Sequence, residues 1–195
     1  MCRVRVADMT ALAVGPVALR PLKLTDAPKL RAIVDEESWQ GNSTPFPTSD
    51  DQMRDHLRSL IEADNFEMYA VELDGRFVGR TGLYDIVPGI RCQIGYTIYG
   101  RNVWGTVVNP SAKLMLFRRA FEDFGMHRVA LRCDHRNTRS RSAIARLGAQ
   151  FEGTLRSFRP AADGTIADID YFSVIRAEWP GVEVGLEERI ARYQG

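Results

Sequence analysis

A short loop at residues 104–111 leads directly into an amphipathic helical pattern at residues 112–124. The loop contains Gly105, and Asn109 followed by Pro110 is the order typical of a helix N-cap and a first helical position. The first N–H groups of a helix have no partner within the helix, and they carry a partial positive charge. The sequence therefore predicts a helix start that suits a phosphate or a pyrophosphate.

Around this loop the sequence alternates between the periods of strands and helices, which predicts one mixed sheet with flanking helices. Asp74-Gly75 is the strongest short hairpin signal, and Gly95 indicates a bulge or a close backbone approach. Gly125 is expected to end the helix that follows the loop, and Asp163-Gly164 to form a turn. Strands are expected near residues 17–22, 68–73, 77–83, 94–98, 129–133, 150–158 and 168–175, and helices near residues 27–36, 50–63, 110–124 and 140–147.

The length of 195 residues fits one domain with a real core. We expect residues 1–16 to be a loose leader, residues 17–180 to be the folded domain and residues 181–195 to be a C-terminal helix or tail. The net charge of +1 gives no broad basic surface, which argues against a nucleic-acid partner. No segment has the length and apolar character of a signal peptide or a membrane span, which argues against a membrane protein.

Three cysteines, Cys2, Cys92 and Cys133, are scattered along the chain. They form neither a CxxC pair nor a cluster with histidine, so no metal site is predicted. Scattered thiols of this kind favour a reduced, cytoplasmic setting over a disulfide framework.

Downstream of the loop, Asn137 and Ser140 precede Gly148, and a Glu152-Gly153-x-x-Arg156 segment follows. In combination with the strand–helix–strand order, this pattern resembles the GNAT acyltransferases, and within them the branch of ribosomal-protein N-terminal acetyltransferases. The resemblance covers roughly residues 17–180. It implies a mixed α/β fold with a central, mostly antiparallel seven-stranded sheet and about four helices. It also implies a splay between the fourth and fifth strands, which would be residues 94–98 and 129–133.

The resemblance implies acetyl-CoA or another acyl-CoA as co-substrate. Diverging strands leave N–H and C=O groups without partners, and these can pair with the amides of a pantetheine arm. The usual glycine-rich signature is reduced here to Gly105, and Pro110 removes one donor. Lys113 would either supply a further donor or be a solvated helix lysine. The expected cofactor-binding residues are Tyr96, Thr97, Ile98, Trp104, Gly105, Thr106, Val107, Val108, Asn109, Lys113, Asn137 and Ser142.

Ser140 has two interpretations. A serine at this spacing is typical of a helix N-cap. The resemblance instead places Ser140 beside the thioester sulfur, where its hydroxyl would stabilise the departing thiolate and act as the catalytic group. Both roles can coexist.

The general base that deprotonates the amine is not evident. Where the ribosomal-protein enzymes have a glutamate, this chain has Arg156-Ser157-Phe158-Arg159. Asp85, Asp168, Asp170 and His135 are the remaining candidates, although each is also typical of a strand end or a surface loop.

Trp39, Asp85 and Arg156 are expected to line the acceptor site, although Trp39 is equally well explained as a loop anchor. Arg156 and Arg159 could bind an acidic acceptor or a dicarboxylic acyl group such as succinyl, or be solvated strand charges. The acceptor would be a protein N-terminus, an amino acid or a small amine, and a homodimer is left open. Two alternatives to acetyl transfer are a succinyl-CoA-using transferase and an acyl-CoA-binding or interaction module with little catalysis.

Overall fold

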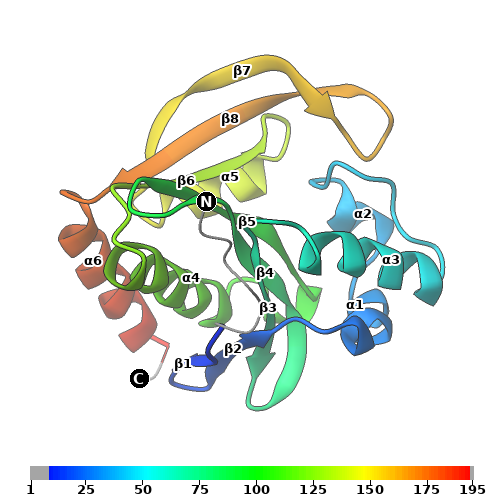
Figure 1. The fold of residues 1–195 in the computed structure, drawn as a ribbon, viewed down its shortest axis with the longest axis horizontal. Coiled ribbons are helices and arrows are strands. Elements are labelled where there is room, and N and C mark those ends of the chain that lie inside the picture. Colours follow the sequence, from blue (N-terminus) through cyan, green and yellow to red (C-terminus); the bar gives the residue numbers. More distant parts are fainter. Residues whose placement is uncertain (1–8, 194–195) are drawn as a thin grey trace.

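Eight strands form a single sheet in residues 9–193, the part of the chain that the computed structural model describes (Figure 1). The sheet order is β1-β2-β3-β4-β5-β6-β8-β7, and β5 with β6 is its one parallel pair. The strands are β1 (Leu12–Val14), β2 (Val17–Pro21), β3 (Glu67–Leu73), β4 (Arg76–Val87), β5 (Arg91–Tyr99), β6 (Arg128–Asp134), β7 (Gln150–Pro160) and β8 (Ile166–Ile175). The helices are α1 (Ala27–Ile33), α2 (Glu36–Trp39), α3 (Asp50–Ile61), α4 (Val108–Arg118), α5 (Thr138–Ala145) and α6 (Trp179–Ala191).

The hairpin between β3 and β4 forms where the sequence predicts it. Asp74 and Gly75 have φ angles of 50° and 74°. Positive φ at both central residues is what a two-residue type I′ turn requires, and Asp-Gly accepts this conformation at low cost. The prediction at Asp74-Gly75 is therefore confirmed.

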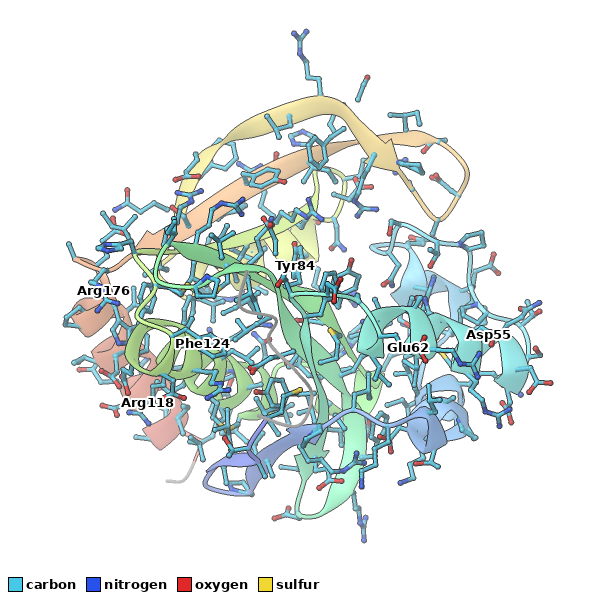
Figure 2. The ribbon with its side chains drawn as sticks, viewed as in Figure 1. Asp55, Glu62, Tyr84, Arg118, Phe124 and Arg176 are labelled. Carbon is cyan, nitrogen blue, oxygen red and sulfur yellow. The ribbon has the colours of Figure 1, made fainter. Side chains whose placement is uncertain are left out.

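Helices cover both faces of the sheet, and the side chains of β3 show how the two faces are divided. Tyr69 and Val71 belong to the core cluster that includes the buried residues of α4 and α6. Met68 and Ala70, which alternate with them, belong to the cluster formed with α1 and α3. Successive side chains of a strand point to opposite faces, so this one strand contributes to both cores. Figure 2 shows Asp55 and Glu62 beside α3 at one end of the molecule, and Arg118 near α6 at the other.

The parallel strands β5 and β6 pair over only part of their length. Their register runs from Arg91 opposite Arg128 to Ile94 opposite Leu131 and then stops. Beyond this point β6 continues to Asp134 and β5 to Tyr99, so the facing backbone groups of the two strands no longer meet. The predicted splay between these two strands is confirmed.

Two expectations about the ends of the chain differ from the structure. Leu12–Val14, which fell within the expected loose leader, form β1 and pair with β2, so the sheet has eight strands rather than seven. Residues 1–8 of that leader and residues 194–195 of the expected tail lie outside the described residues. Residues 179–191 form α6, which packs against α4 through Trp179 and Phe117 at a ring separation of 5.6 Å. None of the described helices could cross a membrane.

The start of α4 also differs from the prediction. The helix begins at Val108, with Val107 at the N-cap position and no side-chain cap, so Asn109 and Pro110 already lie inside the first turn. The helix is buried on nearly every side, because the sheet covers one side and α6 the other. The amphipathic interpretation was therefore wrong. Gly125, with φ of 63°, follows the π-helical turn Arg119–Asp123 that extends α4, and it ends the helix as expected.

Candidate active site

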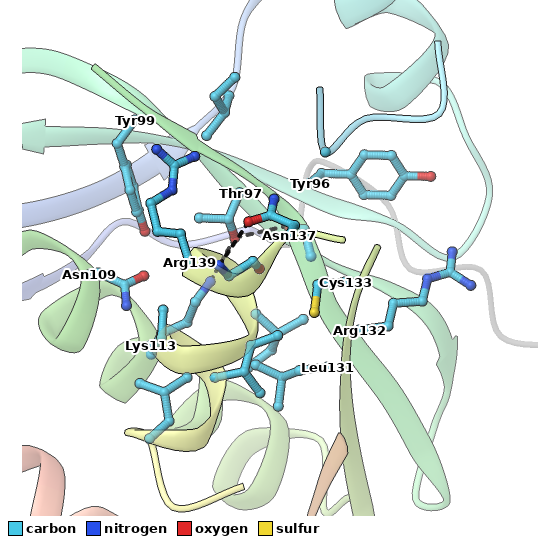
Figure 3. A pocket seen from close by; sticks show the side chains of 18 of the residues that line it. Tyr96, Thr97, Tyr99, Asn109, Lys113, Leu131, Arg132, Cys133, Asn137 and Arg139 are labelled. Carbon is cyan, nitrogen blue, oxygen red and sulfur yellow. Dashed lines mark hydrogen bonds between the residues drawn. The ribbon is translucent and has the colours of Figure 1, made fainter. Parts of the chain in front are cut away.

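A pocket of about 320 Å³ lies where β5 and β6 diverge (Figure 3). Its walls come from β5, β6, the start of α4, the first turns of α5 and residues 41–43 of the loop after α2. Arg189 of α6 and Arg159 of β7 complete the lining. Ten of the predicted site residues line this pocket: Tyr96, Thr97, Ile98, Trp104, Gly105, Thr106, Asn109, Lys113, Asn137 and Ser140.

A bulge in β5 shapes the middle of the pocket. The register between β4 and β5 shifts at this point, and Tyr96 adopts a positive φ of 51°. A Cβ atom at Gly95 would lie 2.6 Å from Cε1 of Tyr84, so glycine permits the close approach of that ring. Both roles predicted for Gly95 are thus present, with the unusual backbone angle one residue further on.

Arg80 of β4 supports this bulge from the side of α3. Its guanidinium is fully buried, donates to the carbonyl oxygen of Tyr96 and lies 3.0 Å from Nε2 of His56. Burial lowers the pKa of Arg80 to about 10 and that of His56 to about 3. His56 is therefore neutral at pH 7 and accepts a hydrogen bond from the charged Arg80.

Lys113 lies inside the pocket and is not a solvated helix lysine. Its Nζ donates to Oγ1 of Thr97 at 2.6 Å and to Oγ1 of Thr81 at 3.2 Å. The residue is 5% exposed, and burial lowers its pKa from 10.5 to about 7. Lys113 thus connects α4 to β4 and β5 through these two hydroxyls.

Asn137 and Ser140 enter the pocket at the start of α5, and Asn137 provides the helix cap. Its Oδ1 accepts a hydrogen bond from the backbone N–H of Ser140 at 2.9 Å, so the prediction that Ser140 is the N-cap was wrong. Burial raises the pKa of the Cys133 thiol to about 11, and a hydrogen bond with the Ser140 hydroxyl opposes this effect in part. The Ser140 side chain thus does not serve as the helix N-cap that its spacing indicated.

Six of the predicted site residues do not line the pocket. Val108 is the first residue of α4 and is fully buried, Val107 precedes it at the N-cap position, and Ser142 is exposed on α5. Trp39 is fully buried, and its Nε1 donates to the carbonyl oxygen of Thr44 at 2.9 Å, so it is a loop anchor.

Asp85 and Arg156 lie away from the pocket as well. Asp85 forms an ion pair with Arg91 and accepts from Gln93 at 3.1 Å, near the hairpin at the far end of β5. Arg156 is exposed on β7. Their assignments to the acceptor site are therefore corrected.

The remaining candidates for a general base also form ion pairs or hydrogen bonds with other residues. Asp170 is buried, pairs with Arg141 and accepts from Thr154 at 2.6 Å. His135 binds the same carboxylate at 2.9 Å, and Asp168 accepts from the N–H of Ser157 at 2.7 Å. Among the described residues, Asp134 is the single carboxylate that lines the pocket.

Both carboxylate oxygens of Asp134 already accept hydrogen bonds. Arg136 donates to both of its oxygens, at 2.8 Å from Nη2 and 3.0 Å from Nε. Although burial opposes it, these hydrogen bonds keep the pKa of Asp134 below its usual value. A carboxylate held in this way is a weak proton acceptor.

Several cations of the pocket were missed by the sequence analysis. Arg139 lies over the ring of Trp104 at 3.7 Å, and Arg189 donates to the carbonyl oxygen of Arg146 at 3.4 Å. The missed cations come from β6, α5, α6 and the residue after α5, and no local pattern connects these positions. Those that line the pocket are Arg132, Arg139, Arg146 and Arg189.

Comparison with known proteins identifies the family. The model of the acetyltransferase (GNAT) domain matches residues 17–150 of this chain. The chain belongs to the GNAT acetyltransferase family. GNAT enzymes take the acetyl group from acetyl-CoA, and the chain is a GNAT N-acetyltransferase.

The similar proteins cover nearly the whole chain. The "Uncharacterized N-acetyltransferase p20" of Bacillus licheniformis is 30% identical over 183 residues, which are 89% of this chain and all of the relative. YdaF of Bacillus subtilis (strain 168), provisionally named a ribosomal N-acetyltransferase, is 26% identical over 85% of this chain and 94% of its own. A solved structure from T. thermophilus, provisionally described as an acetyltransferase, has a TM-score of 0.86 and 32% identity, covering 92% of this GNAT chain and 96% of that one.

Proposed function

We propose that this GNAT enzyme transfers the acetyl group of acetyl-CoA to the α-amine of a protein N-terminus, by direct attack within a ternary complex. The observation that carries the proposal is the course of the pocket. It connects the loop before α4 with the first turn of α5 and continues to Tyr84 on the other face of the sheet. A donor and an acceptor can therefore enter from different sides and meet near Ser140.

The residues at the donor end fit coenzyme A. The edge of β5 after Ile94 offers unpaired backbone groups to an extended chain of amides. The loop before α4 has Gly105 in a left-handed conformation with φ of 75°, and N–H groups at a helix start suit phosphates. Arg139, Arg146 and Arg189 add positive charge around that end. When bound, acetyl-CoA supplies the acetyl group as a thioester.

Ser140 is the proposed catalytic residue at the centre. Its hydroxyl can donate to the departing sulfur, and the partial positive charge at the start of α5 stabilises a thiolate at the same place. A serine hydroxyl is a weak acid, so the proposed contribution is a hydrogen bond to the developing charge rather than full proton transfer.

The lack of a free carboxylate in the described pocket supports an α-amine as acceptor. Attack requires the neutral amine, and Asp134 is held by Arg136. An α-amino group has a pKa of about 8, whereas a lysine amine has a pKa of about 10.4, so only the former is substantially neutral near pH 8 without help. The name of YdaF, which refers to ribosomal N-acetylation, is consistent with an N-terminal acceptor.

The test measures release of the CoA thiol from acetyl-CoA with two forms of one peptide. One form has a free N-terminus and no lysine, and the other has a blocked N-terminus and one lysine. We expect turnover with the free N-terminus and little with the lysine form at pH 8. Ser140→Ala should lower kcat by about 10²-fold, as loss of a positioned donor typically does, and leave the KM for acetyl-CoA nearly unchanged.

Ser142→Ala is the matched control, because Ser142 lies on the same helix but is exposed and outside the pocket. It should turn over like the wild type. Wild-type turnover by the Ser140→Ala enzyme would contradict the catalytic assignment, and preference for the lysine form would contradict the proposed acceptor.

A further inference from the structure

Two arginines face the pocket at its acceptor end. Arg132 lies on β6, where Nη1 donates to the hydroxyl of Tyr171 at 2.9 Å and the guanidinium lies 5.3 Å from the ring centre of Tyr84. Arg159 lies on β7, and Nη2 donates to the carbonyl oxygen of Gly41 at 3.0 Å. These contacts orient both guanidinium groups, but all of them are to neutral groups.

Among the described residues, Asp134 attracts Arg159 from a distance, but no carboxylate pairs directly with either arginine of this pair. Neither Arg132 nor Arg159 belongs to an ion pair there, and the nearby Asp134 already has both oxygens bound by Arg136. The pKa of Arg159 is lowered, first by burial and then by the positive charge of Arg132, and the negative charge of Asp134 offsets part of this effect. The two cations repel each other in a partly desolvated place, although burial is offset at Arg132 by Tyr84 and Tyr171, which raise its pKa, and a bound anion would relieve the repulsion.

Other arginines on the same sheet and its helices do form ion pairs with carboxylates. Arg20 binds Asp26 at 2.7 Å, Arg118 binds Glu183 at 2.7 Å and Arg119 binds Glu67 at 2.8 Å. The absence of a carboxylate partner at Arg132 and Arg159 in the described chain is thus a property of the pocket and not of the whole surface. A third guanidinium, that of Arg80, lies 6.0 Å from the ring centre of Tyr96 and adds to the positive potential.

We propose that Arg132 and Arg159 bind a carboxylate of the substrate. This inference rests on the proposed function and names its substrate class: an acceptor amine that carries a carboxylate in its first few residues. Two guanidinium groups bind a carboxylate through charge-assisted hydrogen bonds, and the rings of Tyr84 and Tyr171 exclude water around it. The same charges disfavour polycationic acceptors such as aminoglycosides. A carboxylate on the acyl group of the donor has the same chemistry, and the experiment separates the two sources.

The experiment compares two peptides with free N-termini that differ only in having glutamate or glutamine at the second position. With acetyl-CoA, the wild type should prefer the glutamate peptide by about tenfold or more in kcat/KM, the size expected for a hydrogen bond to a charged group. Arg159→Gln should abolish this preference by raising KM with little change in kcat, because the contact is remote from the reacting atoms. Arg156→Gln, on the same strand but outside the pocket, should keep it.

A second arm offers succinyl-CoA and acetyl-CoA with the glutamine peptide. A preference for succinyl-CoA that Arg159→Gln removes would support the carboxylate site and assign it to the acyl group. Equal rates for both peptides and both donors would overturn the inference while leaving the proposed acetyl transfer intact.

Calorimetric binding of the two peptides to the CoA-saturated enzyme tests the inference independently of turnover. If the wild type binds the glutamate peptide more tightly and Arg159→Gln loses this difference, the carboxylate site is supported even when neither peptide is acetylated. Absence of acetylation of both peptides would refute the proposed acceptor, not the carboxylate site. Equal binding of the two peptides, with no preference for succinyl-CoA, would overturn it.

Discussion

Lys113 projects from α4 into the pocket and ends between the hydroxyls of Thr81 and Thr97. Those two hydroxyls also hydrogen-bond each other at 2.7 Å, so they keep a partner when the amine is absent. No carboxylate of the described chain binds the Lys113 amine, and burial alone lowers its pKa to about 7. Folding therefore favours the neutral amine, whereas the unfolded chain binds a proton at pH 7.

Lys113→Met should raise the free energy of unfolding at pH 7. In the wild type, stability falls as the pH falls from 10.5 to about 7, because the unfolded chain takes up a proton that folded Lys113 does not. The gain from methionine should be largest at pH 7 and below and should reach at most about 5 kcal/mol, since the pKa falls from 10.5 to about 7 and one unit of pKa difference is worth about 1.4 kcal/mol. The gain should disappear near pH 10. Urea unfolding of both proteins across this pH range measures it.

Lys23→Met controls for the loss of a lysine that is exposed. It should leave the pH dependence of stability as it is in the wild type. A pH-independent difference between the wild type and Lys113→Met would show that the amine is charged in the folded protein at pH 7.

At the scale of elements, α5 follows β6 closely, and the residue that caps the start of α5 also lines the pocket. Asn137 is this cap, and its side chain both accepts from the N–H of Ser140 and faces the pocket. Asn137 thus stabilises the helix and, in the proposed function, forms hydrogen bonds with the amides of the pantetheine arm. Substitutions that separate acceptor from donor capacity distinguish the two roles.

Asn137→Ala should lower the free energy of unfolding by about 1 kcal/mol, the usual loss for a missing cap, and should also weaken CoA binding. Asn137→Asp keeps the capping oxygen but removes the amide donor and adds a negative charge. It should therefore retain stability while still losing CoA affinity. Thermal unfolding and calorimetric titration with CoA measure the two effects, and unchanged CoA affinity in both variants would reduce Asn137 to a structural cap.

Elements decided by local chemistry were predictable, and those decided by packing were not. The hairpin at Asp74-Gly75 forms because its backbone angles suit these two residues wherever they occur. The start of α4 was misplaced because Asn109 and Pro110 resemble a cap, whereas burial of Val108 extends the helix by two residues. The strand β1 was missed because only pairing with β2 stabilises three residues as a strand.

At the scale of the whole molecule, the pocket is assembled from distant parts of the sequence. The hydroxyl of Tyr193 donates to the carbonyl oxygen of Gly105 at 2.9 Å, linking the end of the described chain to the loop before α4. Arg139 of α5 lies over Trp104 of the same loop. A ligand in this pocket contacts elements that separate on unfolding, so its binding should stabilise the fold as a unit.

Addition of CoA should raise the midpoint of thermal unfolding. A ligand present at 100 times its Kd stabilises the folded state by about 2.7 kcal/mol if it binds only that state. Arg139→Gln should reduce the shift at a given CoA concentration, because it removes a positive charge next to the loop before α4. Arg192→Gln, at an exposed position just after α6 that does not line this pocket, should show the full shift. Equal shifts in all three proteins would argue against CoA at this end of the pocket.

The sequence by itself determined the hairpin at Asp74-Gly75, most strands and helices, the position of the splay and the family. These follow from residue types and spacings that act locally or form a recognisable motif. Only the tertiary structure decided which charges face the pocket. On β7 the register shifts between Leu155 and Arg159, and Ser157 has a positive φ of 49°. Arg159 lines the pocket while Arg156, three residues earlier, is exposed outside it, because the packing of β7 against the rest of the molecule decides which of its side chains meet the pocket.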